Sequence, residues 1–272
     1  MFDQPYMLNA LGAGLCAGIA CGTAGVFVVT MHLSFLSVCI AHAAFAGALM
    51  GVWLRVSPLL CAAVFSIGAA LVIGPLADRG ELSPDASAGI VFSLMLGLAF
   101  LFLGLIPGSR SEALSLFWGG ILTVTEHDLL ILALTMITTL VLVVLFFKEI
   151  QAVVCHRQVA AAVGIPATLV FYGMLFITAT TIAVSLRIVG GLLIYSLIIN
   201  AAAAAFQLTY RLKSLFVLSA AFGVLSCWTG LAASYWWDLP AGAAIVIVSS
   251  LLFGGALLLS PKRGAVASPK EP

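Results

Sequence analysis

Cys39 and His42 carry metal-binding side chains and lie three positions apart in a long apolar stretch. Residues three apart share one face of a helix. Thiolate sulfur and imidazole nitrogen both bind zinc and other soft or borderline cations. The alternative is structural: the histidine hydrogen-bonds a neighbouring helix, and the cysteine packs as a small hydrophobe. The spacing alone leaves both interpretations open.

The other polar side chains in apolar surroundings favour structural roles. His32 falls at an expected break between two helices, and Thr125 with Asp128 has the spacing of an N-terminal helix cap. Asn200 is a single amide in a long apolar stretch, where amides more often join helices than bind ligands. Arg187 stands at the end of such a stretch, so we expect its side chain to extend toward the membrane surface.

The distribution of charge predicts that membrane helices position these residues. The chain has 272 residues, of which 63% are hydrophobic and 8% charged, and its net charge is +1. This composition excludes an ordinary soluble enzyme, a disordered chain and a nucleic-acid binder. Asp, Glu, Lys and Arg are absent from residues 4–54, 56–77, 86–109, 129–147, 158–186, 188–210, 214–237 and 239–261. About 20 apolar residues cross a bilayer, and such a run must be helical because the backbone has no water to bond.

These stretches predict an all-α, polytopic transmembrane helical bundle of about eight to nine spans, with nine the central value and ten the upper limit. Residues 4–54 are long enough for two spans, with a break at 31–34. Residues 113–125 are short and contain two glycines, so we expect a short, re-entrant or partial span there. A single transmembrane domain then covers residues 1–262, followed by a disordered cytoplasmic tail at 263–272.

Lysine and arginine predict the orientation of the C-terminal half, because basic loops stay in the cytoplasm. Three basic segments alternate correctly for the cytoplasmic side: Lys148 with Arg157, Arg211 with Lys213, and Lys262 with Arg263 and Lys270. Trp236 and Trp237 then lie at the outer interface. The orientation of the N-terminal half stays open, because it depends on whether residues 113–125 cross the membrane.

A polar segment at residues 148–166 interrupts the apolar pattern. Its alanines favour a short helix, and Gly164 followed by Pro166 is a typical helix stop. The segment is either a simple connecting loop or a helix on which a cytoplasmic partner docks. The chain has no phosphate-binding P-loop and no protease or hydrolase motif, so neither ATP hydrolysis nor other catalysis is expected of it.

Six short motifs follow one another along the chain, and their order and spacing together are more specific than any one of them. They are Leu33–Gly47 with His42 inside it, Asp85–Ser93, Leu116–Leu122 with Asp128, Ala160–Pro166, Val189–Leu193 and Asp238–Val246. Together they resemble the integral-membrane permease subunits of bacterial ATP-binding-cassette importers for zinc, manganese and iron, over about residues 8–259. The resemblance implies a permease fold like that of the vitamin B12 importers, and a multi-pass protein of the bacterial inner membrane.

The resemblance also implies partners and roles. It predicts a homodimer around a central path, a cytoplasmic ATPase dimer, and a periplasmic or lipid-anchored metal-binding protein that delivers a divalent ion, zinc or manganese. No cofactor would be permanently bound. His42 matches the pathway histidine, and we expect Cys39 to assist it. The ATPase would dock on the segment that includes Glu149, His156, Arg157, Ala160 and Gly164.

The chain departs from the family at chemically important positions. Val38 stands where the family has an aspartate, so the expected path lacks a hard oxygen ligand. We hypothesise that Cys39 partly substitutes and shifts the preference toward zinc; a drift toward another substrate is the other interpretation. Six further family residues are replaced, by Met31, His32, Ser37, His156, Gln158 and Ala201. The competing function is an ATP-independent secondary carrier or channel, which would need a charge at mid-membrane that the sequence lacks.

Overall fold

The structure is a computed structural model that describes residues 5–79, 84–107 and 119–262, and regular structure in these ranges is entirely helical. The elements are α1 (Pro5–Thr30), α2 (Ser34–Leu54), α3 (Pro58–Arg79), α4 (Pro84–Leu105), the 3-10 turn η1 (Ile121–Thr123), α6 (Glu126–Leu145), α7 (Phe147–Ala162), α8 (Ala167–Val189), α9 (Gly191–Leu208), α10 (Leu212–Trp237) and α11 (Ala241–Leu258). The predicted tail and residues 113–118 of the predicted partial span lie outside the described ranges.

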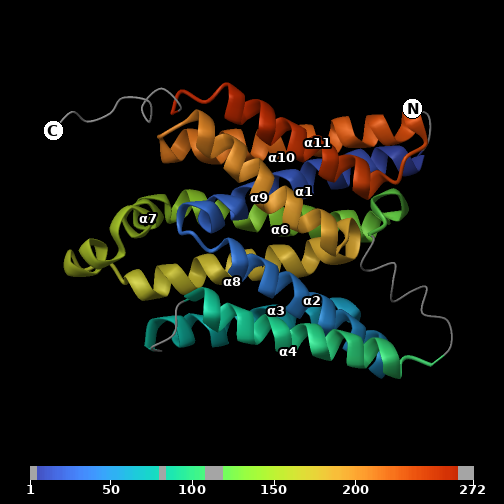
Figure 1. Ribbon diagram of the computed structural model, residues 1–272, viewed down its shortest axis with the longest axis horizontal. Helices are drawn as coiled ribbons and strands as arrows, with labels where there is room; N and C mark the ends of the chain where they lie inside the picture. Colours follow the sequence, from blue (N-terminus) through green and yellow to red (C-terminus); the bar gives the residue numbers. More distant parts are fainter. Residues whose placement is uncertain (1–4, 80–83, 108–118, 263–272) are drawn as a thin grey trace.

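The helices confirm the predicted membrane bundle. Seven of them, within the described part of the chain, are long and apolar enough to cross a membrane. Two further helices contain shorter apolar segments, at Pro58–Ile73 in α3 and Leu193–Leu208 in α9. The helices lie side by side in one elongated bundle (Figure 1). The predicted break between the first two spans is also present, where His32 adopts a left-handed φ of 56° between α1 and α2.

The packing of α1 decides the orientation that the charges left open. Along α1, Gly14 lies against Cys227, Gly18 against Gly223 and Gly22 against Ser219, so α1 and α10 run antiparallel. The start of α1 is therefore at the same end of the bundle as Trp236 and Trp237. The start of α1 and the end of α11 lie at opposite ends of the bundle (Figure 1). The positive-inside rule assigns the basic loops to the cytoplasm, so we expect the start of α1 to face outward and the end of α11 to face inward.

Small residues allow this close helix packing. A Cβ added at Gly18 would lie 2.6 Å from the backbone nitrogen of Val224, and one added at Gly22 would lie 2.6 Å from the carbonyl oxygen of Ser219. The Ser219 hydroxyl donates a 2.6 Å hydrogen bond to the Gly22 carbonyl oxygen. In lipid there is no hydrophobic driving force for helix association, so van der Waals packing and hydrogen bonds hold α1 against α10.

Two backbone turns meet near the outer end of the bundle. Gly119, with a φ of 79°, precedes η1, and Gly190, with a φ of 93°, separates α8 from α9. A side chain at Gly119 would collide with the Val189 carbonyl oxygen, so the two turns touch. Asn9 of α1 donates a 3.4 Å hydrogen bond to the Val124 carbonyl oxygen and ties η1 to the first helix.

The polar segment forms α7 at the inner end of the bundle. The helix begins at Phe147, directly after the end of α6, and ends at Ala162, which agrees with the predicted docking segment to about two residues at each end. His156 interrupts it with extended backbone angles, φ −160° and ψ 94°, so α7 consists of two helical pieces. Gly164, with a φ of 90°, and Pro166 follow its end, as predicted. Figure 1 shows α7 projecting beyond the neighbouring helix ends.

Candidate functional site

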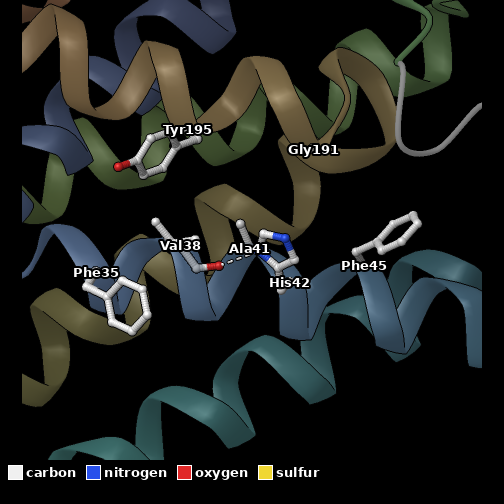
Figure 2. Close-up of a pocket in the computed structure, with 7 residues that line it drawn as sticks. All are labelled: Phe35, Val38, Ala41, His42, Phe45, Gly191 and Tyr195. Atoms are coloured by element: carbon white, nitrogen blue, oxygen red, sulfur yellow. Dashed lines mark hydrogen bonds between the residues drawn. The ribbon is translucent and has the colours of Figure 1, made fainter. Parts of the chain in front are cut away.

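His42 lines a cavity of about 350 Å³ between α2 and α9. The lining residues are Phe35, Val38, Ala41, His42 and Phe45 from α2, and Gly191 and Tyr195 from α9. Figure 2 shows His42 on α2 and Tyr195 on α9, on the two sides of this cavity, with the Tyr195 ring extending above Phe35 and Val38. Apart from the His42 ring and the Tyr195 hydroxyl, the side chains of this wall are apolar.

The imidazole of His42 is held in one tautomer. Its Nδ1 lies 3.0 Å from the Val38 carbonyl oxygen, as the dashed line in Figure 2 shows. A carbonyl oxygen can only accept, so Nδ1 carries a proton, and in the neutral ring Nε2 then holds the lone pair. Phe92 of α4 packs edge-on against the ring, with centroids 4.8 Å apart. A backbone carbonyl on one nitrogen is the arrangement that orients metal-binding histidines in proteins.

Val38 contributes to the same wall one helical turn before His42. The family resemblance implies an aspartate at this position, whereas the isopropyl group of Val38 has no electron pair to donate to a metal ion. Among the described residues, no three or more His, Cys, Asp or Glu side chains come together to hold a metal ion. Among the residues that line this cavity, His42 is the one with a side-chain nitrogen.

Cys39 lies elsewhere. It is fully buried, with 0% of its surface exposed, and is absent from the cavity wall. Side chains three positions apart on a helix point in directions that differ by about 60° around its axis. Here that difference turns Cys39 into the packing between helices, away from the cavity. The structure therefore brings His42 together with Tyr195 and not with Cys39. A role for Cys39 in the path remains a prediction.

The residues predicted to dock the ATPase lie on α7 and the turn that follows it. The side facing the bundle is apolar, with Ile150, Val153 and Ala160 buried. The Arg157 guanidinium lies 4.5 Å above the Phe171 ring of α8, which fastens α7 to the next span. His156 and Gly164 are exposed. Glu149 is half-buried, and one carboxylate oxygen, Oε2, is buried and accepts no hydrogen bond from the described chain.

At the outer end, the predicted cap of α6 is present, and Arg187 forms an ion pair with its Asp128. The Thr125 hydroxyl accepts from the Asp128 backbone at 3.2 Å, and the Asp128 carboxylate accepts in turn from the Thr125 N–H at 3.4 Å. Arg187 lies 3.7 Å from the same carboxylate, so its side chain forms an ion pair in addition to reaching the surface. No sequence spacing links Arg187 to Asp128, because α6 and α8 meet only in the folded bundle.

A second, larger cavity was not foreseen. It measures about 970 Å³ and lies between η1, the outer half of α9 and the outer half of α11. Tyr195 lines this cavity and the His42 cavity alike. Its polar wall contains Ser196, Asn200 and Ser250. The signal in the sequence that could have indicated this cavity is Asn200, a single amide in an apolar stretch. Its predicted role in joining helices is confirmed by its hydrogen bonds to α11.

Comparison with known proteins gives consistent matches over nearly the whole chain. The pattern of the ABC 3 transport family matches residues 3–260. The manganese transport system membrane protein MntC of Listeria monocytogenes is 30% identical over 272 residues, which are 100% of this chain and 96% of that protein. The high-affinity zinc uptake system membrane protein ZnuB of Haemophilus influenzae is 28% identical over 253 residues, 93% of this chain and 96% of that protein.

A solved structure shows the same architecture. PsaBC from Streptococcus pneumoniae, solved in complex with a Fab, contains a chain that superposes with a TM-score of 0.87 at 26% sequence identity. The match covers 97% of this chain and 95% of that one.

Proposed function

Since this chain belongs to the ABC 3 transport family, we propose that it imports divalent metal ions as the permease of an ATP-driven transporter. Permeases of this kind are multi-pass proteins of the bacterial plasma membrane, and the apolar helices of the bundle agree with that location. The relatives described above carry manganese or zinc in their names, which supports a divalent cation as the substrate.

The observation that carries the proposal is the position of His42. An ionisable side chain inside a membrane is costly and is retained mainly where it serves a path or a relay. The His42 ring is oriented by a backbone carbonyl and directs Nε2 away from its own helix, in a cavity wall. A single neutral nitrogen donor binds a cation weakly, and weak binding suits a path from which the ion must leave.

The donor set favours zinc over manganese. Manganese prefers carboxylate and carbonyl oxygens, whereas imidazole nitrogen suits zinc well. Val38 removes the carboxylate at the position one turn before His42. A homodimer would place a second His42 across the central path and raise the number of nitrogen donors to two.

Energy would come from separate subunits. We infer that a dimer of cytoplasmic ATPases docks on α7, because its exposed residues face the cytoplasm while its apolar side packs on α8. ATP binding would move α7 and shift the spans between outward-open and inward-open states. A periplasmic or lipid-anchored metal-binding protein would deliver the ion to the outer face.

Uptake by the reconstituted complex tests the proposal. In proteoliposomes containing the permease and its ATPase, we expect zinc and manganese accumulation that requires ATP hydrolysis. Permease His42→Ala should lower uptake, and Cys39→Ala tests the predicted assistance from the thiol. Undiminished transport by both variants would contradict the assignment of the path. Uptake by the permease without its ATPase would instead favour a secondary carrier or channel.

A further inference from the structure

The wall of the larger cavity carries an ordered group of neutral polar side chains at mid-membrane. Asn200 of α9 lies opposite Ser249 and Ser250 of α11, and its Nδ2 is 3.0 Å and 3.1 Å from their hydroxyl oxygens. Nδ2 is also 3.2 Å from the hydroxyl of Ser196, one turn earlier on α9. Ser196 and Ser249 hydrogen-bond each other as well.

These contacts determine which way the Asn200 amide points. Ser249 and Ser250 donate their hydroxyl protons to the Val246 carbonyl oxygen, at 2.8 Å and 2.9 Å. Their oxygens can therefore only accept from Asn200, so the amide group that faces α11 must be the NH₂. The carbonyl oxygen Oδ1 points away from α11, and no donor in the described chain reaches it. Asn200 lines the cavity and is half-buried, so Oδ1 is accessible to a ligand there.

We propose that this cavity is the outer part of the metal path and that Asn200 and Ser250 contact the hydrated ion within it. The inference rests on the proposed function and assigns two new contact residues to it. Carbonyl and hydroxyl oxygens are ligands of hydrated divalent cations and can replace water around them. A neutral set provides oxygen contacts without a charge that would trap the ion.

Tyr195 connects this outer cavity to His42. It precedes Ser196 on α9 and belongs to the walls of both cavities. The outer cavity begins at η1 and the starts of α9 and α11, which are all at the outer end of the bundle. An ion that enters there meets the oxygens of Asn200 and Ser250 and then passes Tyr195 to reach the imidazole.

Helix joining alone explains only half of the arrangement. It accounts for the Nδ2 hydrogen bonds between α9 and α11. It leaves the Oδ1 acceptor of Asn200 without a donor from the described chain, although unpartnered polar groups are costly in a membrane span.

Opposite substitutions at Asn200 separate the two explanations. In the reconstituted complex, Asn200→Leu removes Oδ1, and we expect KM for manganese and for zinc to rise about three- to tenfold, the value of one hydrogen bond. Asn200→Asp retains the oxygen and adds charge, so KM should fall and turnover should slow. If Asn200 only joins helices, both variants lower thermal stability and leave KM unchanged, and that result would overturn the inference.

A matched serine pair provides the control. Ser250 and Ser226 each donate to the carbonyl four residues earlier in their own helix, at 2.9 Å and 2.7 Å, but Ser226 is buried in helix packing. Ser250→Ala should raise KM, and Ser226→Ala should leave it unchanged. Absence of ATP-dependent uptake by the unchanged complex would refute the proposed function itself. Uptake that depends on His42 but is indifferent to Asn200 and Ser250 would refute only this inference.

Discussion

At the scale of the residue, the candidate path depends on one donor held in one orientation. The Val38 carbonyl fixes Nδ1 of His42 and Phe92 supports the ring, so Nε2 is available without any reorganisation. The Val38 side chain lies on the same wall and adds no donor. Under the proposed function, the choice between metals would depend on the side chain at residue 38, next to the His42 imidazole.

Val38→Asp should shift the preference toward manganese. The new carboxylate would lie one turn from His42 and provide a hard oxygen ligand. A carboxylate in a span costs about 2.5–3.5 kcal/mol, so the variant should melt at a lower temperature without metal. Added manganese should raise its melting temperature more than that of the unchanged protein, because a ligand stabilises the state that binds it.

Val38→Asn is the control for this prediction, because asparagine has nearly the same size as aspartate but carries no charge. It should show neither the metal-dependent stabilisation nor a change in the ratio of manganese to zinc uptake. Equal stabilisation of both variants by manganese would mean that the carboxylate at residue 38 does not contact the ion.

At the scale of the element, close approach of helices positions the cavities. The glycines of α1 allow α10 to pack against its backbone, and the turns at Gly119 and Gly190 bring η1 against the start of α9. The walls of both cavities then follow from where α9 lies between α2 and α11. A change in one helix contact is expected to alter the path at a distance.

Gly18→Val should destabilise the bundle. Its first side-chain carbon would lie 2.6 Å from the Val224 backbone nitrogen and would force α1 away from α10. Overpacking of this kind costs about 1–3 kcal/mol, which thermal unfolding in detergent would detect. Gly97→Val in α4 is the matched control, since an added Cβ there meets nothing within 4 Å. Equal melting temperatures for the two variants would show that the α1–α10 contact is looser than described.

At the scale of the whole molecule, the two ends of the bundle have different tasks. The outer end holds η1, the Asp128–Arg187 ion pair and the larger cavity. The inner end holds α7 and the turn that follows it, where Val159 and Val163 expose 57% and 75% of their surfaces. Exposed apolar side chains outside the membrane spans are typical of a surface that a partner covers.

Val159→Asp with Val163→Asp should prevent co-purification of the ATPase while the permease remains folded. Two carboxylates would be costly to bury in an apolar contact. Tyr210→Asp is the control, because Tyr210 is 74% exposed in the connection between α9 and α10 at the same end of the bundle and lies off α7. Retention of the ATPase by the double variant would place the docking surface elsewhere.

The sequence by itself determined the membrane location, the helical class, the approximate number and limits of the spans, and the polar segment that became α7. Lipid imposes these properties locally: a span has a minimum length, its backbone must bond to itself, and charges mark its ends. The cap at Thr125 and the helix stop at Gly164 followed from equally local rules. Capping and turn formation involve only a few consecutive residues.

Only the tertiary structure decided which side chains share a cavity. Spans such as α2 are apolar on every side, so their sequence does not indicate how each helix is rotated about its axis. Packing of small residues sets that rotation, which turned Cys39 into the core and placed His42 opposite Tyr195. The direction of the Asn200 amide, the pairing of Arg187 with Asp128 and the outward position of the N-terminal end depend on contacts between distant segments. Such contacts exist only once the helices have assembled.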